Sequence, residues 1–191
     1  MHCLLCESLS LSHICPNCQE LFLQPSIYKQ KLSNGVEVIS FYNYEEIKHL
    51  LHTKHTYLGY YIFSILAKNS FKKFAQNFVY SSTIASIGVD DVPKEEYSHT
   101  ALLNKELKSE YIKPLYNKLR ATNSVSYSGK SREFRLINPR NFELKPFAQK
   151  ELILVDDIIT TGSTLTQATQ ALQKSDKEVL FCLTLANASL K

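Results

Sequence analysis

The chain has 191 residues, 44% of them hydrophobic and 21% charged, with a formal net charge of +4. This composition is typical of a globular protein with a sizeable core. Met1 is followed by polar residues and cysteine rather than by a signal peptide, and the longest apolar run, 57–67, is too short to span a bilayer. We therefore expect a cytoplasmic protein and exclude an integral membrane protein.

Four of the five cysteines lie in the first 18 residues, as two Cys-x-x-Cys pairs with eight residues between them: Cys3, Cys6, Cys15 and Cys18. Four thiolates at this spacing suit a closed tetrahedral site for structural Zn²⁺. Two disulfides or a redox-active pair are the alternatives, and disulfides fit poorly with a cytosolic chain. Because so short a segment cannot bury a core, metal binding would supply its folding energy.

The residues after the cysteines predict a connection over 19–35, because Pro25, Asn34 and Gly35 interrupt any regular pattern there. The predicted organisation is a zinc-binding module with its linker at 1–35, followed by a larger domain at 36–191.

Hydrophobic periodicity in the larger domain predicts alternating strands and helices. The predicted strands are 36–42, a segment within 77–87, 115–119, 152–155 and 179–186. One predicted helix starts at 43 or 44. The other predicted helices cover 57–74, 99–110 and the residues around 165–172. This alternation favours an α/β fold with a mostly parallel sheet flanked by helices. Within it, we expect Cys182 to be a buried apolar residue, and Tyr57, Tyr60 and Tyr61 to pack within their helix.

The positive charge is concentrated in residues 101–150, which hold eleven Lys and Arg against four Asp and Glu. Such a segment suits a polyanion, and aromatic residues between the charges can stack on bases. A solvated basic face is the alternative. A Ser/Gly-rich stretch at 123–130 is expected to be mobile. The best candidates for binding DNA lie at its end or after it: Lys130, Arg132, Arg135 and Arg140.

The most informative stretch is 152–164, where a buried strand is followed by Asp156 and Asp157, a hydroxyl-rich turn and a helix. The turn consists of Thr160, Thr161, Gly162, Ser163 and Thr164. Its backbone N–H groups and the positive helix end suit a phosphate, and glycine allows a positive φ. The carboxylates can accept hydrogen bonds from ribose hydroxyls or hold Mg²⁺ beside a diphosphate. The alternative is an ordinary strand–helix turn with a solvated acidic end.

This stretch resembles the phosphoribosyl-diphosphate (PRPP) loop of type I phosphoribosyltransferases. The resemblance implies that the acidic pair contacts the ribose hydroxyls and that the Thr-Thr-Gly-Ser-Thr turn wraps the 5′-phosphate. It also implies a type I phosphoribosyltransferase-like sheet with a small N-terminal Cys₄ zinc module, and Mg²⁺ bound together with PRPP.

The zinc module, the loop and the length together resemble the ComF family of competence-associated proteins. The matching segments are Phe41-Tyr42-Asn43-Tyr44 with Ile47-Lys48, Leu50-Leu51 and Lys54, and Ser131-Arg132-Glu133 with Asn138 and Phe142. The resemblance implies that Lys54 lies in the loop that faces diphosphate. Where the family commonly has Arg-Gly-Phe-Asn-Gln, this chain has Glu95-Glu96-Tyr97-Ser98-His99, which argues against transferase chemistry by that loop.

The resemblance implies a factor for natural transformation that handles incoming single-stranded DNA and binds PRPP or a related sugar phosphate. Its expected place is the cytoplasm at the periphery of the inner membrane, with a membrane DNA channel or a competence helicase as candidate partners. An active phosphoribosyltransferase of nucleotide salvage is the alternative. The sequence identifies no catalytic residue, so enzymatic activity stays open.

Overall fold

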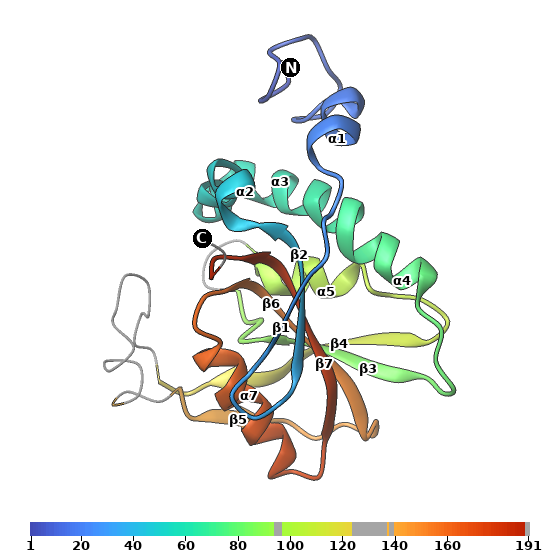
Figure 1. Ribbon diagram of the computed structural model, residues 1–191, viewed down its shortest axis with the longest axis vertical. Coiled ribbons are helices and arrows are strands. Elements are labelled where there is room, and N and C mark those ends of the chain that lie inside the picture. Colours follow the sequence, from blue (N-terminus) through green and yellow to red (C-terminus); the bar gives the residue numbers. More distant parts are fainter. Residues whose placement is uncertain (94–96, 124–136, 138–139, 190–191) are drawn as a thin grey trace.

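The computed structural model describes residues 1–93, 97–123, 137 and 140–189 (Figure 1). Within these residues, one mixed sheet of seven strands has the order β1-β2-β7-β6-β3-β4-β5. The strands are β1 (Tyr28–Lys31), β2 (Glu37–Asn43), β3 (Ile84–Val89), β4 (Ile112–Ala121), β5 (Phe142–Leu144), β6 (Glu151–Ile159) and β7 (Glu178–Asn187). The five inner strands run parallel and the two outer ones antiparallel, so the predicted α/β fold is confirmed.

Helices cover both faces of this sheet (Figure 1). Among the described residues they are α1 (Pro16–Phe22), α2 (Tyr44–Leu51), η1 (His52–His55), α3 (Tyr57–Ala67), η2 (Lys68–Lys72), α4 (Lys73–Asn77), α5 (His99–Lys105) and α7 (Ser163–Gln173). The expected start of α2 is confirmed, because the Asn43 side-chain oxygen accepts a hydrogen bond from the Glu45 N–H at 3.0 Å and caps the helix.

Several elements differ from expectation: β5 was not predicted, α5 ends at Lys105 rather than at 110, and two further differences have a local cause. The predicted connection at 19–35 contains β1, which forms a hairpin with β2 through a turn where Gly35 has a φ of +87°. The helix predicted over 57–74 is interrupted by the π-helical turn η2, where the Ser70 hydroxyl donates to the Leu66 carbonyl at 2.7 Å. Both features depend on tertiary pairing or on backbone geometry that periodicity does not reveal.

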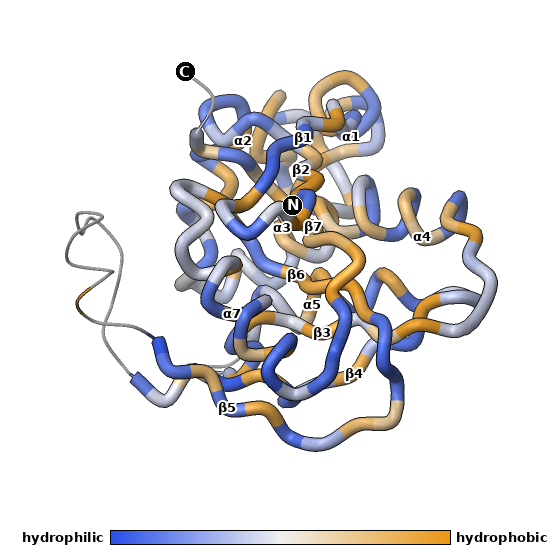
Figure 2. Tube along the Cα trace, turned by 60° about the horizontal axis from the view of Figure 1, so that its bottom comes forward, coloured by the Kyte–Doolittle hydropathy of each residue, from blue (hydrophilic) through white to orange (hydrophobic). Residues whose placement is uncertain are grey.

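The central strand β6 is buried on both of its faces. Leu152 and Leu154 pack in the same core as α7, whereas Ile153 and Val155 pack in the core formed with α2, α3 and α4. All four side chains are fully buried, and each such burial contributes about 1.5–3 kcal/mol. Hydrophobic stretches run through β3, β6 and β7 in Figure 2, while α7 alternates between hydrophilic and hydrophobic turns. This packing fixes β6 and therefore the acidic pair that it carries.

The N-terminal cysteine segment packs onto the larger of these cores. Ile14 and Leu23, on either side of α1, are buried in the same cluster as Phe41 and Phe71. In Figure 1 this segment stands above the helices on one side of the sheet. The segment therefore covers apolar surface of the main sheet and helices. Within the described part of the chain, no helix is both long and apolar enough to cross a membrane.

Candidate functional site

The acidic pair lies within the carboxyl-terminal half of β6 rather than after it. The strand extends to Ile159, because Asp156 and Ile158 still pair with β7 through Thr184 and Ala186. The Asp156 carboxylate accepts a hydrogen bond from the Asp157 N–H at 2.9 Å, and the Asp157 carboxylate accepts one from the Ile158 N–H at 2.8 Å. Both carboxylates are thus held by the backbone at the edge of the sheet where the parallel strands end.

The two carboxylates have different electrostatic environments. Burial, and next the neighbouring charge of Asp157, raise the pKa of Asp156 well above its usual range, although Arg140 opposes this. Asp157 instead has a cationic partner, because its Oδ2 lies 3.3 Å from Lys54 Nζ. Two carboxyl groups side by side, one of them paired with a cation, can accept hydrogen bonds from two neighbouring hydroxyls.

The turn after β6 leads directly into α7 and forms a small pocket. Gly162 caps α7 with a φ of +73°, and its carbonyl accepts from the Thr166 N–H at 2.8 Å. The first N–H groups of an α-helix have no partner within the helix, so they can bind an anion here. The pocket is lined by Asp156, Ile158, Ile159, Thr160, Gly162, Ser163, Thr164 and Leu165. Thr160 and Thr161 are exposed at its rim.

Replacement of Gly162 by Ala is expected to weaken anion binding and to lower stability by about 1–2 kcal/mol. An L-residue is strained at this φ, and the added Cβ would lie 2.7 Å from Leu32 Cδ2. Thermal unfolding and phosphate titration would measure both effects. Gly35→Ala is the matched control, because its φ is also positive but an added Cβ would meet no atom within 4 Å. Equal phosphate affinity in wild type and Gly162→Ala would contradict the expectation.

Lys54 reaches the acidic pair from η1, which precedes α3. Gly59 allows α3 to approach this loop, since an added Cβ would lie 2.3 Å from both the Thr53 carbonyl oxygen and the Tyr97 hydroxyl. The Tyr97 hydroxyl in turn donates to the Lys54 carbonyl at 2.6 Å. Two segments far apart in the sequence thus contact each other next to Lys54, whose Nζ pairs with Asp157.

Arg140 is the candidate DNA-binding residue that the structure describes. Its Nη1 lies 3.6 Å from Asp90 Oδ2, and its backbone N–H donates to Gln167 Oε1 of α7 at 2.8 Å. Its side chain is 18% exposed, and its charge acts on the pKa of Asp156. Arg140 therefore contacts Asp90 and α7, and its charge reaches the acidic pair. Lys130, Arg132 and Arg135 lie outside the described residues.

The end of β3 supplies two further acidic residues, Asp90 and Asp91, which were not among the predicted site residues. Asp90 has a φ of +51° and pairs with Arg140, whereas Asp91 is 4% exposed and accepts two hydrogen bonds from the Asn117 N–H. Burial raises the pKa of Asp91. The sequence does contain a pattern that could have identified Asp90 and Asp91 as candidate site residues. They follow the apolar residues of β3 just as Asp156 and Asp157 follow those of β6.

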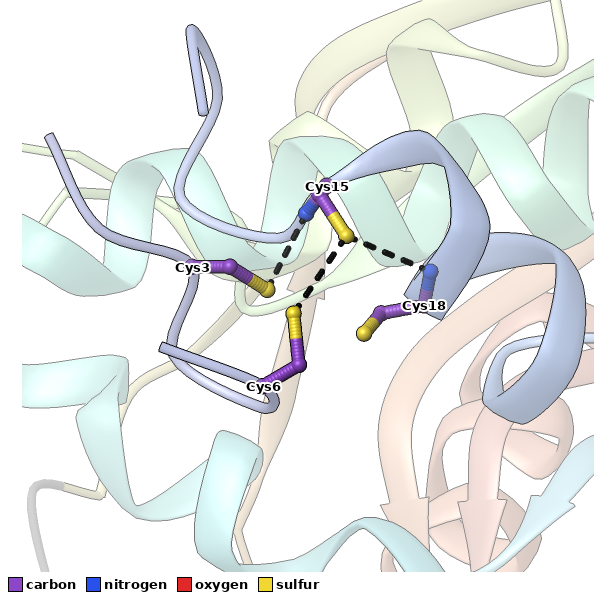
Figure 3. A group of neighbouring side chains, drawn as sticks. All are labelled: Cys3, Cys6, Cys15 and Cys18. Atoms are coloured by element: carbon purple, nitrogen blue, oxygen red, sulfur yellow. Dashed lines mark hydrogen bonds between the residues drawn. The ribbon is translucent and has the colours of Figure 1, made fainter. Parts of the chain in front are cut away.

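The four N-terminal cysteines form a second cluster, in which all sulfur atoms lie within 4.8 Å of one another (Figure 3). Cys6 Sγ and Cys15 Sγ are 3.7 Å apart, which matches the edge of about 3.8 Å in a tetrahedron with Zn–S bonds of about 2.3 Å. The Cys15 N–H donates to Cys3 Sγ at 3.2 Å and the Cys18 N–H to Cys15 Sγ at 3.5 Å. These four cysteines could bind a metal such as zinc.

Two of these thiols are also disposed to ionise. For Cys3, burial opposes ionisation, but backbone N–H groups of Cys15, Leu5 and Cys6 lower its pKa to about 6. The Ser8 hydroxyl, 3.0 Å from Cys6 Sγ, lowers the pKa of Cys6. Burial, and next the neighbouring cysteines, raise the pKa of Cys18, so this thiol would lose its proton when a metal binds. Cys182 is fully buried within β7, as expected, and belongs to the core facing α7.

The chain matches one family model and is similar to several solved structures. A family model described as PRTase-CE matches residues 27–190. No curated protein matches significantly. A hypoxanthine phosphoribosyltransferase from Staphylococcus aureus is 14% identical, with 68% of this chain and 67% of that chain covered and a TM-score of 0.40. An orotate phosphoribosyltransferase from Mycobacterium tuberculosis is 15% identical, with 91% of this chain and 85% of that chain covered and a TM-score of 0.41. An orotate phosphoribosyltransferase from Aeropyrum pernix is 16% identical, with 91% of this chain and 82% of that chain covered and a TM-score of 0.38.

Proposed function

The chain belongs to the PRTase-CE family, and from this premise we propose a cytoplasmic competence factor that binds PRPP with Mg²⁺ and handles incoming single-stranded DNA. One observation carries the ligand assignment. Asp156 and Asp157, Lys54 and the N-terminus of α7 come together at the carboxyl end of β6. Groups that accept from hydroxyls, neutralise phosphate and donate backbone N–H bonds thus lie near one another at the end of β6, which supports a sugar phosphate as the ligand.

Each part of this site takes one part of PRPP in the proposed complex. The acidic pair binds the two ribose hydroxyls, and the turn Thr160–Thr164 holds the 5′-phosphate. Lys54 faces the diphosphate, whose charge Mg²⁺ would neutralise when bound. With PRPP present, Lys54 would exchange part of its contact with Asp157 for a contact with phosphate.

The cysteine cluster has a structural role in this proposal. Zn²⁺ held by Cys3, Cys6, Cys15 and Cys18 stabilises a module at 1–35, and residues 36–191 form the phosphoribosyltransferase-like domain. The protein would work in the cytoplasm at the periphery of the inner membrane, next to a DNA channel or a competence helicase. Lys130, Arg132, Arg135 and Arg140 are the proposed contacts to DNA phosphates.

Lys54→Ala is expected to reduce PRPP affinity at least about tenfold, because a charge-assisted hydrogen bond to phosphate contributes about 1.5–3 kcal/mol. Calorimetric titration with PRPP and Mg²⁺ measures the effect. Lys48→Ala is the matched control, because Lys48 is half exposed and pairs only with Glu45 on the surface of α2 at 2.6 Å. If both variants bind PRPP as tightly as wild type, Lys54 does not face the diphosphate.

The experiment that tests the proposed function combines two titrations on the same preparation. PRPP with Mg²⁺ should bind the wild-type protein, and a fluorescent single-stranded oligonucleotide should bind with an affinity that falls steeply as salt rises. Wild-type protein that binds neither ligand would refute the proposal. Binding of DNA that is indifferent to salt would refute the assigned phosphate contacts.

Phosphoribosyl transfer is the second candidate function, and the juxtaposition of Lys54 with the acidic pair favours it. A transferase must hold PRPP and stabilise diphosphate as it leaves, and these groups are placed to do both. It predicts Mg²⁺-dependent release of diphosphate from PRPP in the presence of a purine, pyrimidine or nicotinic acceptor. Absence of turnover with all three classes would count against it.

A further inference from the structure

A second cavity, of about 540 Å³, lies between the cysteine segment and the helices α3 and α5. Its lining shares no residue with the pocket at the end of β6. Ligand sites in proteins commonly have volumes in this range. Its lining includes residues from three parts of the chain: Leu11 and His13, then Tyr57, Tyr60, Tyr61 and Lys68, and finally Lys105 and Glu106.

Three tyrosines of α3 form an ordered wall of this cavity. Tyr61 stands at their centre, with ring centroids 5.3 Å from Tyr57 and 5.4 Å from Tyr60, at interplanar angles of 70° and 88°. The Tyr57 and Tyr61 hydroxyl oxygens are 2.7 Å apart, and His13 lies against Tyr61 with centroids 4.7 Å apart. These contacts hold the rings in place. Because edge-to-face contacts do not cover both faces of each ring, the wall still has free aromatic surface.

The exposure of this wall differs from the sequence-based expectation of packing within the helix. Tyr57 is 69% exposed and Tyr60 is 42% exposed. Leu11 of the cysteine segment is fully exposed at the opposite side of the cavity. Large apolar side chains that gather around a cavity without covering one another indicate a binding surface.

The charges at the cavity select the kind of ligand. Lys68 and Lys105 line it, and neither forms an ion pair within the described part of the chain. Glu106 is the one acidic residue in the lining. Exposed rings next to unneutralised lysines suit a ligand that is both planar and anionic. Single-stranded nucleic acid has this chemistry, because its bases stack on aromatic rings while its phosphates pair with lysine.

We propose that this cavity binds single-stranded DNA, with bases stacked on Tyr57 and Tyr60 and phosphates next to Lys68 and Lys105. The proposal rests on the proposed DNA-handling function and assigns the base contacts to α3. It also gives the cysteine segment a role in binding, because that segment builds one wall of the cavity and contacts Tyr61 through His13.

The test uses fluorescence anisotropy with fluorescein-labelled dT15 and the full chain. Tyr57→Ala and Tyr60→Ala should each weaken binding at least fivefold, since stacking contributes about 1–3 kcal/mol per base. Tyr57→Phe should bind as wild type, because it keeps the ring. Phe22→Ala is the matched control, because Phe22 is 64% exposed on α1 and does not line the cavity. An abasic oligomer of equal length should bind wild type and Tyr57→Ala equally.

The outcomes separate the proposal from the function on which it rests. If wild type binds dT15 but Tyr57→Ala and Tyr60→Ala bind equally well, the stacking site is wrong and the DNA-handling function survives. The stacking site is also wrong if Phe22→Ala weakens binding as much as they do. If wild type does not bind dT15, the DNA-handling function itself fails. PRPP titration of each variant verifies that its fold is intact.

Discussion

Asp156→Asn should lower PRPP affinity about 100-fold or more while leaving the protein at least as stable as wild type at pH 8. Loss of one acceptor beside two ribose hydroxyls removes hydrogen bonds that the other carboxylate cannot replace, and about 2.7 kcal/mol corresponds to 100-fold. The stability follows from burial and from the Asp157 charge, which both disfavour an ionised Asp156. Asparagine removes that penalty but still accepts from the Asp157 N–H.

The same environment gives the variant a distinct pH profile. A carboxyl whose folded-state pKa is raised binds a proton more tightly when folded, so its favourable contribution is complete below the unfolded pKa of about 3.9. That contribution is lost as the pH rises through the raised pKa of folded Asp156. Thermal unfolding from pH 4 to 8 should therefore show less loss of stability in Asp156→Asn than in wild type.

Asp176→Asn is the control for this experiment, because Asp176 is exposed in the turn after α7. It should leave both PRPP affinity and the pH profile unchanged. Wild-type affinity for PRPP in Asp156→Asn would contradict the ribose-binding role. A stability more than about 1 kcal/mol below wild type at pH 8 would instead show that the ionised carboxylate is needed for folding.

Most of the main sheet could be predicted because its strands carry a strong local signal. Residues 152–155 are apolar at four consecutive positions, and the structure confirms that they are buried on both faces of β6. The edge strand β1 has no such signal, because its residues alternate between half-buried and exposed and its pairing with β2 depends on a turn. The family match and the cysteine cluster confirm the ComF-type, phosphoribosyltransferase-like domain expected from the sequence.

The sequence predicts the part of the candidate site that is continuous in the chain. It predicts less of the contacts between residues from distant segments. Asp156 to Thr164 form one continuous motif, and Lys54 was placed only through resemblance. Arg140 and Asp90 come together from segments 50 residues apart, so their pairing depends on the order of strands in the sheet. The exposure of Tyr57 likewise depends on how the cysteine segment packs, which helical periodicity cannot reveal.

The cysteine cluster is expected to determine the stability of the whole chain, because it shares a core with the sheet. Ile14 and Leu23 are at most 1% exposed and lie in the same cluster as Phe41. If the segment unfolds, these two side chains leave that cluster. Exposure of two such residues costs about 3–6 kcal/mol. Each kcal/mol corresponds to about 2–4 °C in a protein of this size.

Removal of zinc with a strong chelator should therefore lower the Tm by about 10 °C or more, and Cys18→Ser should do the same without chelator. Mass spectrometry under native conditions should find about one zinc ion per wild-type chain and none in Cys18→Ser. Because the segment forms one wall of the tyrosine cavity, dT15 affinity should fall together with the metal content.

Cys182→Ala separates loss of metal from loss of a buried cysteine, because Cys182 is fully buried but lies in the other core. It should retain zinc and dT15 affinity and cost only about 1 kcal/mol, as removal of a small buried group does. A wild-type chain that holds no zinc, or that lacks reactive thiols at its N-terminus, would favour the disulfide alternative. Equal Tm values with and without chelator would show that packing alone, without metal, holds the segment on α3 and the sheet.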